Sequence, residues 1–527
     1  MVTMVKAPEC GTCHWLSFPA ICSIATAMLL VYSHAGAAEW KITPSLDLKE
    51  SYTDNVTLAP PGLEKSEFIT QINPGISLTG TGPRLKLNAN YAMQNLVYAE
   101  ESSRNTFNHM LNANANAELV DNLFFLDGRA AISQQNISLL GPQATDNVNV
   151  TGNRTEVKTY SVSPYLRHSF SNFASSELRY THDEVSTGVG GLSGSQADRI
   201  QLQMNSGPAF NTLGWGLNYS NQKTAYGNTT NINAQNIDNE ILTGNLRYPV
   251  TPRFSLTATG GYEKNNYIST GAKPEGSFWS AGFSWAPSAR TSIDASAGRR
   301  YFGDNYSLAA SHHTRLTAWS LGYSEDITST RSQFLIPVTI DTAGFLNQLW
   351  AATIPDPVIR QQFVDAFIQG TGLPPALSES INYLTNRFFL QKRLQASVAV
   401  TGAKNTLILS LYTTSREAQT SQAQDSPLLG NSTLALSDRT KQVGCNAFWN
   451  WRIGPRTSAN INAGYTRNSS PSLGRTDNDK IIRLSLARQL QPKLNGSVEL
   501  RRLQRDSSQS GGDYRENAAT ASLSMRF

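Results

Sequence analysis

The chain has 527 residues, of which 39% are hydrophobic and only 16% are charged, and its formal net charge is +5. Soluble globular domains carry about 25% charged residues, so this composition argues against a set of soluble domains. The charges are spread along the chain without a basic block, which argues against nucleic-acid binding. The remaining residues are rich in Asn, Ser, Thr, Gln and Gly. This mixture suits a wall that faces lipid with every second residue and water with the others.

The N-terminus has the features of a signal peptide over residues 1–38. Lys6 precedes an apolar run over 20–32, and the small residues Ala35-Gly36-Ala37-Ala38 provide a cleavage site. The apolar run is shorter than the roughly 20 residues that a transmembrane helix needs. We therefore expect export and cleavage rather than a helical membrane anchor.

From residue 39 onward, apolar and polar residues alternate with a period of two, which is typical of strands between two environments. In 84–94, for example, the apolar set is Leu85, Leu87, Ala89, Tyr91 and Met93. The alternation predicts strands near 41–51, 68–79, 84–98, 106–119, 123–137, 155–168, 173–185, 198–210, 213–226, 237–249, 253–267, 275–286, 290–302, 312–325, 386–400, 404–417, 437–452, 456–468, 479–490, 493–505 and 515–527.

The connections between these strands are of two kinds. Short turns with Pro or Gly occur at 80–84, 251–253, 286–290, 454–456 and 491–493, and longer polar segments occur at 138–154, 186–197, 419–437 and 469–477. Short periplasmic turns and long external loops are typical of bacterial outer-membrane barrels. The fold class that we predict is therefore all-β, a transmembrane antiparallel up-and-down β-barrel over 39–527.

The predicted strands are odd in number, whereas bacterial single-chain barrels have even numbers. A further strand at Arg331–Ile340 would restore parity, with Phe334, Ile336 and Val338 on one face. Pro337 weakens this assignment because proline removes a ladder donor. With this strand we expect about 22 strands, within a range of roughly 20 to 24.

The segment 341–385 is the place where a helix is predicted. Asp356-Pro357 suits a helix start and Gly370 a helix end. Strand parity puts this insert in a long external loop. Because its apolar stripe would be unfavourable in water, we expect it to fold inward or to pack against other loops as a lid. A gating or constricting role is the alternative.

Aromatic residues and the last strand carry further signals. Trp and Tyr residues beside turns predict girdles at the membrane interfaces; they are Trp215, Trp279, Trp285, Trp319, Trp449, Trp451, Tyr91, Tyr262 and Tyr301.

The final strand alternates apolar and polar residues and ends on an aromatic residue. It resembles the C-terminal strand that barrel-assembly machinery recognises, which assigns an assembly signal to Leu523, Met525 and Phe527.

No catalytic, cofactor-binding or metal-ligating residue is predicted, and no cofactor is expected. The predicted mature chain has the histidines His109, His168, His182, His312 and His313. The adjacent pair points to opposite faces of a strand and cannot jointly ligate a metal. Ser is so frequent that a Ser/His/Asp triad cannot be singled out. Cys445 shares a face with apolar residues and is expected to face lipid. We expect that the protein is not an enzyme.

A barrel of this size has an interior that water or a plug must fill. The first strand begins at Trp40, so we expect no plug domain before it. Charges on the lipid face cost about 2–4 kcal/mol near the midplane, so Arg84, Lys86 and Arg526 are candidate lumen-lining residues. Inward arginines would favour anionic solutes or, alternatively, form salt-bridged ladders that brace a closed interior.

The chain resembles the outer-membrane β-barrel family associated with the PEP-CTERM/exosortase system. The likeness rests on Trp40-Lys41-Ile42-Thr43-Pro44-Ser45-Leu46, on Ser51-Tyr52-Thr53-Asp54-Asn55-Val56 and on Asp356-Pro357-Val358-Ile359-Arg360. The resemblance implies a role beside exopolysaccharide biosynthesis, in export or cell-surface assembly. It supplies no catalytic residues that can be transferred to this chain.

Three functions remain open at this point. The first is a pore or conduit linked to exopolysaccharide export, the second a structural or docking barrel for surface components, and the third an outer-membrane lipid-modifying enzyme. The expected location is the outer membrane of a Gram-negative bacterium. The expected partners are outer-membrane lipid and the barrel-assembly machinery, with anionic polysaccharide or export-system components as further candidates and no nucleic acid.

Overall fold

The computed structural model describes residues 39–188, 194–227, 236–335, 346–347, 350, 360, 364, 384–421 and 438–527. These residues form one antiparallel sheet of 22 strands that closes on itself. The strands are β1 (Glu39–Thr53), β2 (Glu67–Thr81), β3 (Leu85–Tyr98), β4 (Thr106–Val120), β5 (Phe124–Asn136), β6 (Arg154–Phe170), β7 (Ala174–Thr187), β8 (Ser195–Ser206), β9 (Gly214–Tyr226), β10 (Ile237–Thr251), β11 (Phe254–Asn265), β12 (Glu275–Ser288), β13 (Thr291–Arg300), β14 (Gly303–His313), β15 (Thr317–Ser329), β16 (Phe388–Thr401), β17 (Asn405–Ala418), β18 (Arg439–Gly454), β19 (Thr457–Ser470), β20 (Arg475–Gln491), β21 (Leu494–Ser507) and β22 (Tyr514–Arg526).

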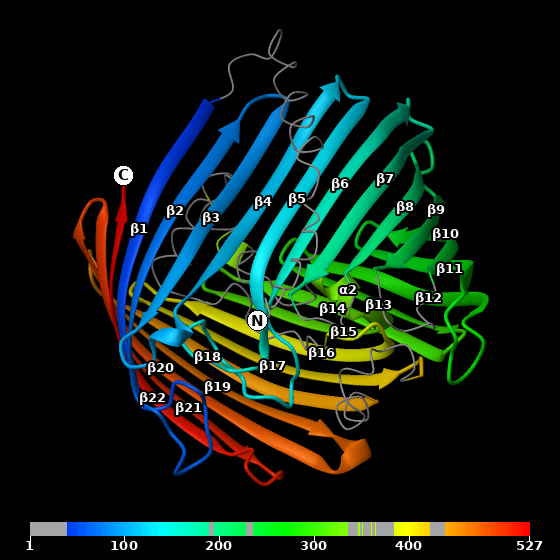
Figure 1. Cartoon of the computed structure of the whole chain (residues 1–527). Coiled ribbons are helices and arrows are strands. Elements are labelled where there is room, and N and C mark those ends of the chain that lie inside the picture. The colour runs from blue at the N-terminus through cyan, green and yellow to red at the C-terminus, as the bar shows by residue number, and fades with distance from the viewer. Residues whose placement is uncertain are drawn as a thin grey trace, which may run out of the picture.

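Each strand pairs with its neighbours in sequence, and the seam is formed by the first and last strands. β22 lies beside β1 (Figure 1), with Ser45 opposite Arg526 and Thr53 opposite Ala518. The hydroxyls of Ser51 and Thr520 are 3.0 Å apart across this seam. The closed ladder leaves no free strand edge, which is the condition for a sheet that crosses a bilayer. The predicted fold, an antiparallel up-and-down transmembrane β-barrel of about 22 strands, is confirmed.

The outer face of the wall is apolar between two charged rims. On β20, Ile482, Leu484 and Leu486 are 50%, 44% and 49% exposed and face outward. Lys480 and Arg488 lie on the same face, eight positions apart. Eight residues rise about 20 Å along the membrane normal at 3.3 Å per residue and a tilt of about 40°. This height is close to the apolar band of about 25 Å that outer-membrane barrels present to lipid.

Exposed indole rings lie on this outer face near the short turns. Trp449 and Trp451 of β18 stack with ring centroids 6.3 Å apart. The indole Nε1 of Trp449 donates a hydrogen bond of 3.1 Å to Oδ1 of Asn405, the first residue of β17. A ring with one polar contact beside a turn fits the membrane interface. Among the described residues, no helix is long and apolar enough to cross a bilayer.

The predicted strand at Arg331–Ile340 is wrong. The helix α2 (Thr330–Leu335) occupies its first part, and the rest lies outside the described residues. The strand that makes the number even is β14, which follows β13 after only two residues. Gly303 begins β14 at φ +119°, a conformation that L side chains rarely adopt. Consequently the predicted strand 312–325 is shifted to β15.

A second difference concerns the predicted long loop 469–477. β19 and β20 extend through most of it, and only the 3-10 helix η4 (Pro471–Leu473) and Gly474 separate them. The predicted signal peptide and the predicted helix at 356–370 lie outside the described residues, apart from Arg360 and Val364. The other 3-10 helix, η1 (Ser102–Arg104), lies in the β3–β4 loop.

Candidate functional site: the lumen and its mouth

The inner wall of β3 and β4 is lined with side-chain amides. Asn88 and Asn90 of β3 face Asn114 and Asn112 of β4 in register, and all four are exposed on the face opposite to the lipid. The Nδ2 of Asn90 donates to Oδ1 of Asn88 at 3.2 Å. Such side chains offer both donors and acceptors without net charge. The four amides therefore form a hydrophilic, uncharged strip. It is bordered by two exposed bases, Lys86 on β3 and Arg129 on β5, which lies opposite Asn114.

The predicted lumen-lining residues occupy two kinds of position. Lys86 lies on the inner face of β3 and Arg526 on the inner face of β22, and both are exposed. Arg84 lies in the β2–β3 turn, where its guanidinium is 3.4 Å from Asp121 of the next turn. The geometry thus separates a rim residue from two wall residues, and their contribution to solute selectivity stays a prediction.

The residues of the predicted assembly signal lie at the seam. Leu523 and Met525 are on the outer face of β22, in register with Leu48 and Leu46 of β1. The backbone N–H of Phe527 donates to the carbonyl of Pro44 at 3.0 Å. The apolar face of the last strand therefore continues that of the first strand. Recognition by the assembly machinery stays a prediction.

The β5–β6 connection, residues 137–153, folds into the barrel, and we name it the lumenal loop. Asn153 fixes its two ends, since Nδ2 donates to the carbonyls of Ser138 at 2.8 Å and Pro142 at 3.0 Å. A Cβ at Gly141 would lie 2.5 Å from Cγ of Asn153, so this close approach requires glycine. These bonds give the loop a compact shape of its own.

The lumenal loop reaches the wall at β20–β22 and is held there by arginine side chains. Nη1 of Arg505 donates to the carbonyl of Gly141 at 2.6 Å, and Arg475 donates to the carbonyl of Leu140. Arg505 is also 2.6 Å from Asp479 on the neighbouring strand. Charge-assisted bonds of this kind are the stronger class of hydrogen bond. The loop backbone is thus bound by inward arginines rather than left in solvent.

Arg501 of β21 is the centre of the same contact. It forms ion pairs with Asp146 of the loop and with Glu516 of β22, whose side chain is fully buried. Asn149 of the loop donates to Glu516 at 2.6 Å. Burial alone would raise the pKa of Asp146, but Arg501 and Arg483 outweigh this effect and hold the pKa below its ordinary value. The docked loop therefore carries an ionised Asp146.

On its other side the lumenal loop packs against β1–β3. The N–H of Val150 donates to the carbonyl of Val56 at 2.9 Å, and the hydroxyl of Tyr98 donates to the carbonyl of Val148 at 3.0 Å. Val148 is buried in a cluster on the inner face with Val56, Ile69, Leu96 and Tyr98. Apolar burial and hydrogen bonds together fix the loop across the seam region of the barrel.

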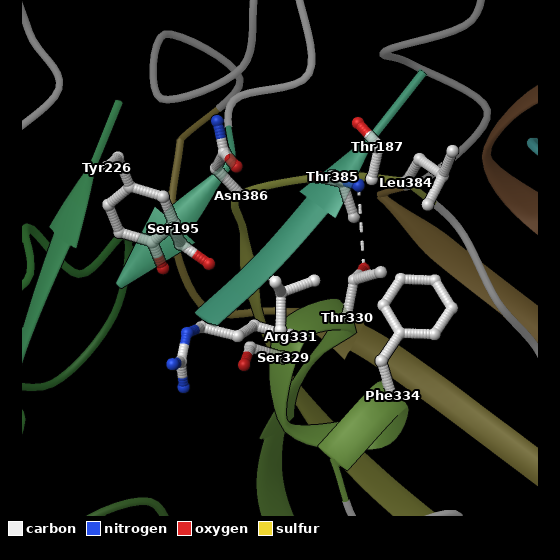
Figure 2. A pocket seen from close by; sticks show the side chains of 11 residues that line it. Thr187, Ser195, Tyr226, Ser329, Thr330, Arg331, Phe334, Leu384, Thr385 and Asn386 are labelled. Carbon is white, nitrogen blue, oxygen red and sulfur yellow. Dashed lines mark hydrogen bonds between the residues drawn. The ribbon is translucent and has the colours of Figure 1, made fainter. Parts of the chain in front are cut away.

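α2 enters the mouth from the opposite part of the wall. It follows β15 directly, and Nη2 of Arg331 donates to the carbonyl of Asp183 on β7 at 2.9 Å. The backbone N–H of Thr385 donates to Oγ1 of Thr330 at 3.4 Å (Figure 2). The helix therefore lies against the inner side of β7 although its own strand is β15.

The lumenal loop and α2 meet at one apolar cluster. The carbonyl of Ile137 accepts a hydrogen bond of 3.2 Å from the N–H of Leu384. Figure 2 shows Phe334 of α2 beside Leu384. The full cluster consists of Val157, Val185, Leu384, Ile137, Phe334 and Leu335. Beside it lies a small, partly open pocket lined by Arg331 and by hydroxyl-bearing residues of β7–β9 and α2.

A third contact bridges the mouth above β13 and β14. Ser269 of the β11–β12 loop forms an antiparallel bridge with Thr420, which follows β17. The ring of Tyr267 stacks on Phe388 with centroids 4.7 Å apart, and its hydroxyl is 2.5 Å from that of Tyr301. The lumenal loop, α2 and this bridge together narrow the end of the barrel that carries the long loops.

Three inward arginines of β20 and β21 form ion pairs rather than an open cationic surface. Arg475, Arg501 and Arg505 are paired with carboxylates of their own or neighbouring strands and of the loop. The sequence analysis expected inward arginines in the strands but assigned Arg475 to a loop, and it did not predict their partner, the lumenal loop. The apolar residues Leu139, Leu140 and Val148 could have indicated that this loop packs inside the barrel, because such residues are unusual in an exposed loop. All three are buried here.

Titratable residues elsewhere do not gather into a metal site within the described part of the chain. His182 and Asp198 are 2.8 Å apart, but both lie on the outer face of the wall. Cys445 is exposed on the outer face of β18, as the sequence predicted.

No model of a known protein family and no characterised protein sequence matches this chain. Among solved structures, the FrpB iron transporter from Neisseria meningitidis is similar with a TM-score of 0.49 and 9% identity over 92% of this chain and 81% of that one. The siderophore receptor PirA from Pseudomonas aeruginosa has a TM-score of 0.45 and 10% identity over 93% and 81% of the two chains. The ferric enterobactin receptor PfeA (R480A_Q482A mutant) from the same organism has a TM-score of 0.45 and 12% identity over 94% and 81%. Identities this low do not extend the ligands of those proteins to this chain.

Proposed function

We propose that this protein is an outer-membrane conduit for hydroxyl-rich polymers, with a mouth that is narrowed by the lumenal loop and α2. The observation that carries the proposal is the inner wall of β3 and β4, where Asn88, Asn90, Asn112 and Asn114 form an exposed, uncharged amide surface. Amides exchange hydrogen bonds with hydroxyl groups as readily as with water, so a sugar chain can slide along them without strong binding.

The resemblance to the PEP-CTERM/exosortase-associated family supports an exopolysaccharide as the polymer. The ion-paired arginines of β20 and β21 affect how strongly the inner wall attracts a charged polymer. Because Arg501 and Arg505 are paired with carboxylates, they attract a polyanion less than free cations would. Lys86 and Arg526 remain exposed on the inner wall. We therefore expect neutral and weakly anionic polysaccharides to pass.

The test is permeation through the full chain in lipid vesicles. Residues 138–152 are replaced by a short Gly-Ser linker, and efflux of neutral and uronate-containing oligosaccharides is compared with that of the unmodified protein. A control replaces the exposed residues 508–510 of the β21–β22 loop, where Ser508 bonds to Thr476 of β20. We expect faster efflux only in the lumenal-loop variant. Equal impermeability of the folded variant and the unmodified protein would overturn the proposal.

The alternative is a docking barrel that carries surface components without transport. The specific observation in its favour is the number of buried polar contacts that fix the lumenal loop, above all Glu516 and Arg505, both almost fully buried. A loop with such contacts is costly to move. A docking barrel should be impermeable to oligosaccharides in its unmodified form, whereas a conduit should already pass them. Efflux from the unmodified protein in the same experiment therefore separates the two functions.

A further inference from the structure

Five basic side chains form a patch on the lipid-facing wall, at the end that carries the long loops. The patch, which we name the outer basic patch, takes one residue from each of five consecutive strands, β18 to β22 (Figure 1). All five side chains are exposed. They are Lys441, Arg467, Lys480, Arg502 and Arg515.

The strand register makes these five residues successive neighbours. The residue opposite Arg467 on β20 is Asn478, and Lys480 is two positions further on the same face. The residue opposite Lys480 on β21 is Gln504, two positions from Arg502. The same diagonal relation joins the remaining members. Diagonal neighbours of this kind have Cα atoms about 7–8 Å apart, within reach of long side chains.

The outer basic patch carries excess positive charge. Lys480 is paired with Asp506 at 2.8 Å, and Arg502 donates to Asn517 at 3.2 Å. The other three bases form no ion pair with a described residue. Like charges at neighbouring positions of a sheet repel one another. The carboxylates beside this row of five bases are Asp506 and, through Asn517, Asp54. The row therefore keeps a positive excess and is complementary to an anion that lies along the wall.

The position of the patch relative to the membrane selects the kind of anion. Directly below it on the same face lie Ile482, Leu500 and Ala519, and the apolar band continues from there toward the short turns. Arg502 is eight positions from Leu494 at the opposite end of β21, which corresponds to about 20 Å along the membrane normal. The bases therefore lie at the level of the lipid headgroups.

The opposite part of the wall differs at the same height. The outward residues at the upper ends of β7–β10 include Glu184, Asp198, Asp238 and Glu240, and Lys223 lies opposite both aspartates in register. This side offers carboxylates where the outer basic patch offers bases. The charge of the outer rim is thus distributed unevenly around the barrel.

We propose that the outer basic patch binds the phosphate groups of a phosphorylated glycolipid of the outer leaflet, with the acyl chains lying along the apolar strip below. Phosphate accepts several charge-assisted hydrogen bonds, and guanidinium groups match its geometry. A polymer in the lumen cannot reach this face, because the closed wall separates the two. The proposal is independent of transport through the barrel.

The test uses the purified full chain in a neutral detergent with diphosphoryl lipid A as the probe, and native mass spectrometry counts the lipid that stays bound. The variant Arg467→Gln/Arg502→Gln/Arg515→Gln is compared with Lys158→Gln/Lys223→Gln/Lys264→Gln, which removes three outward bases of β6, β9 and β11. Each basic residue near an anionic lipid contributes about fivefold in affinity. We expect a loss on the order of 100-fold in the first variant and little change in the second.

Three further measurements make the outcome decisive. Heat-modifiable migration shows that each variant is folded; if the triple variant is not, Arg467→Gln and Arg515→Gln are tested singly for a loss of about fivefold each. Lipid A without phosphates should bind weakly to every form. Equal loss in both triple variants, or none in the first, overturns the proposal. Displacement of the lipid by millimolar inorganic phosphate would overturn it too, because free phosphate would then be the ligand.

Discussion

Arg501 of β21 and Asp146 of the lumenal loop form an ion pair although 355 positions separate them in the sequence. The same guanidinium is 2.9 Å from Glu516 of β22. One arginine therefore joins the loop to two adjacent strands of the wall. Because breaking a buried pair leaves an unpaired charge, the position of the loop depends on the ionisation of its carboxylate.

The pH dependence of loop docking follows from this pair. The pKa of Asp146 is lowered in the folded protein, so the bound proton is disfavoured there. The contribution of the ionised Asp146 to loop docking is complete above the ordinary aspartate pKa of about 3.9 and is lost as the pH falls below this value. We expect the protection of the Val148 and Val150 backbone amides against hydrogen exchange to be the same at pH 7 and pH 5. This protection should fall below about pH 4. Asp146→Asn should remove this step, and a loss of protection already between pH 7 and 5 would contradict the assignment.

The bridge between Ser269 and Thr420 predicts a disulfide. Residues directly opposite in an antiparallel pair have Cα atoms about 4.5–5.5 Å apart, within the range of disulfides. In a Cys445→Ser background, Ser269→Cys/Thr420→Cys should therefore cross-link on mild oxidation, as seen by protease cleavage followed by non-reducing electrophoresis. The control Ser269→Cys/Ser415→Cys, with its second thiol on the outer face, should stay open. Cross-linking in the control but not in the bridge pair would show that the mouth is arranged differently.

The two faces of the wall should respond differently to a charge. Leu484 lies on the outer face, midway between Lys480 and Arg488, so Leu484→Arg should cost about 2–4 kcal/mol of unfolding free energy in a bilayer. Asn114→Arg, on the exposed inner face of β4, should cost much less because its charge remains in water. Urea titration of the protein in vesicles measures both. Equal costs would mean that Leu484 does not face lipid.

Removal of the last residue tests the assembly signal. Phe527 is exposed, and its backbone N–H donates one hydrogen bond to the first strand, at the carbonyl of Pro44. Deletion should therefore change the stability of the purified barrel by less than about 1 kcal/mol. If assembly machinery recognises this residue, the amount of folded protein in the outer membrane should nevertheless fall severalfold. A parallel loss of stability would show instead that Phe527 acts in the fold.

The wall could be predicted from the sequence because its pattern is local. Every second residue of 84–94 is apolar, and the structure places Leu85, Leu87 and Tyr91 outward as the alternation requires. The strand number was right although one strand was misplaced. β14 was overlooked because the connection from β13 is only two residues long and leaves almost no loop. The main sign of this tight turn in the sequence is Gly303, whose φ is positive in the structure.

The contents of the lumen could not be predicted in this way. The polar residues of the lumenal loop resemble those of any external loop, and their partners, such as Arg505, come more than 350 positions later. The burial of Arg505 is compensated by its ion pair with Asp479 together with the carbonyl that Gly141 of the loop presents to it. Such pairings depend on how the closed wall brings distant segments together, and no periodicity encodes them.

The seam between β1 and β22 also has a consequence for how the chain folds. Its partners, Ser51 and Thr520, are 469 positions apart, so the first strand cannot complete its pairing until the last one has been delivered. Until then both strands present unpaired backbone groups, which are templates for aggregation. Closing so long a segment also carries an entropic cost that grows with the logarithm of its length. The slow step of biogenesis should therefore be the meeting of the two ends, and holdase chaperones that shield the nascent edge in transit should matter more for this chain than for a small barrel.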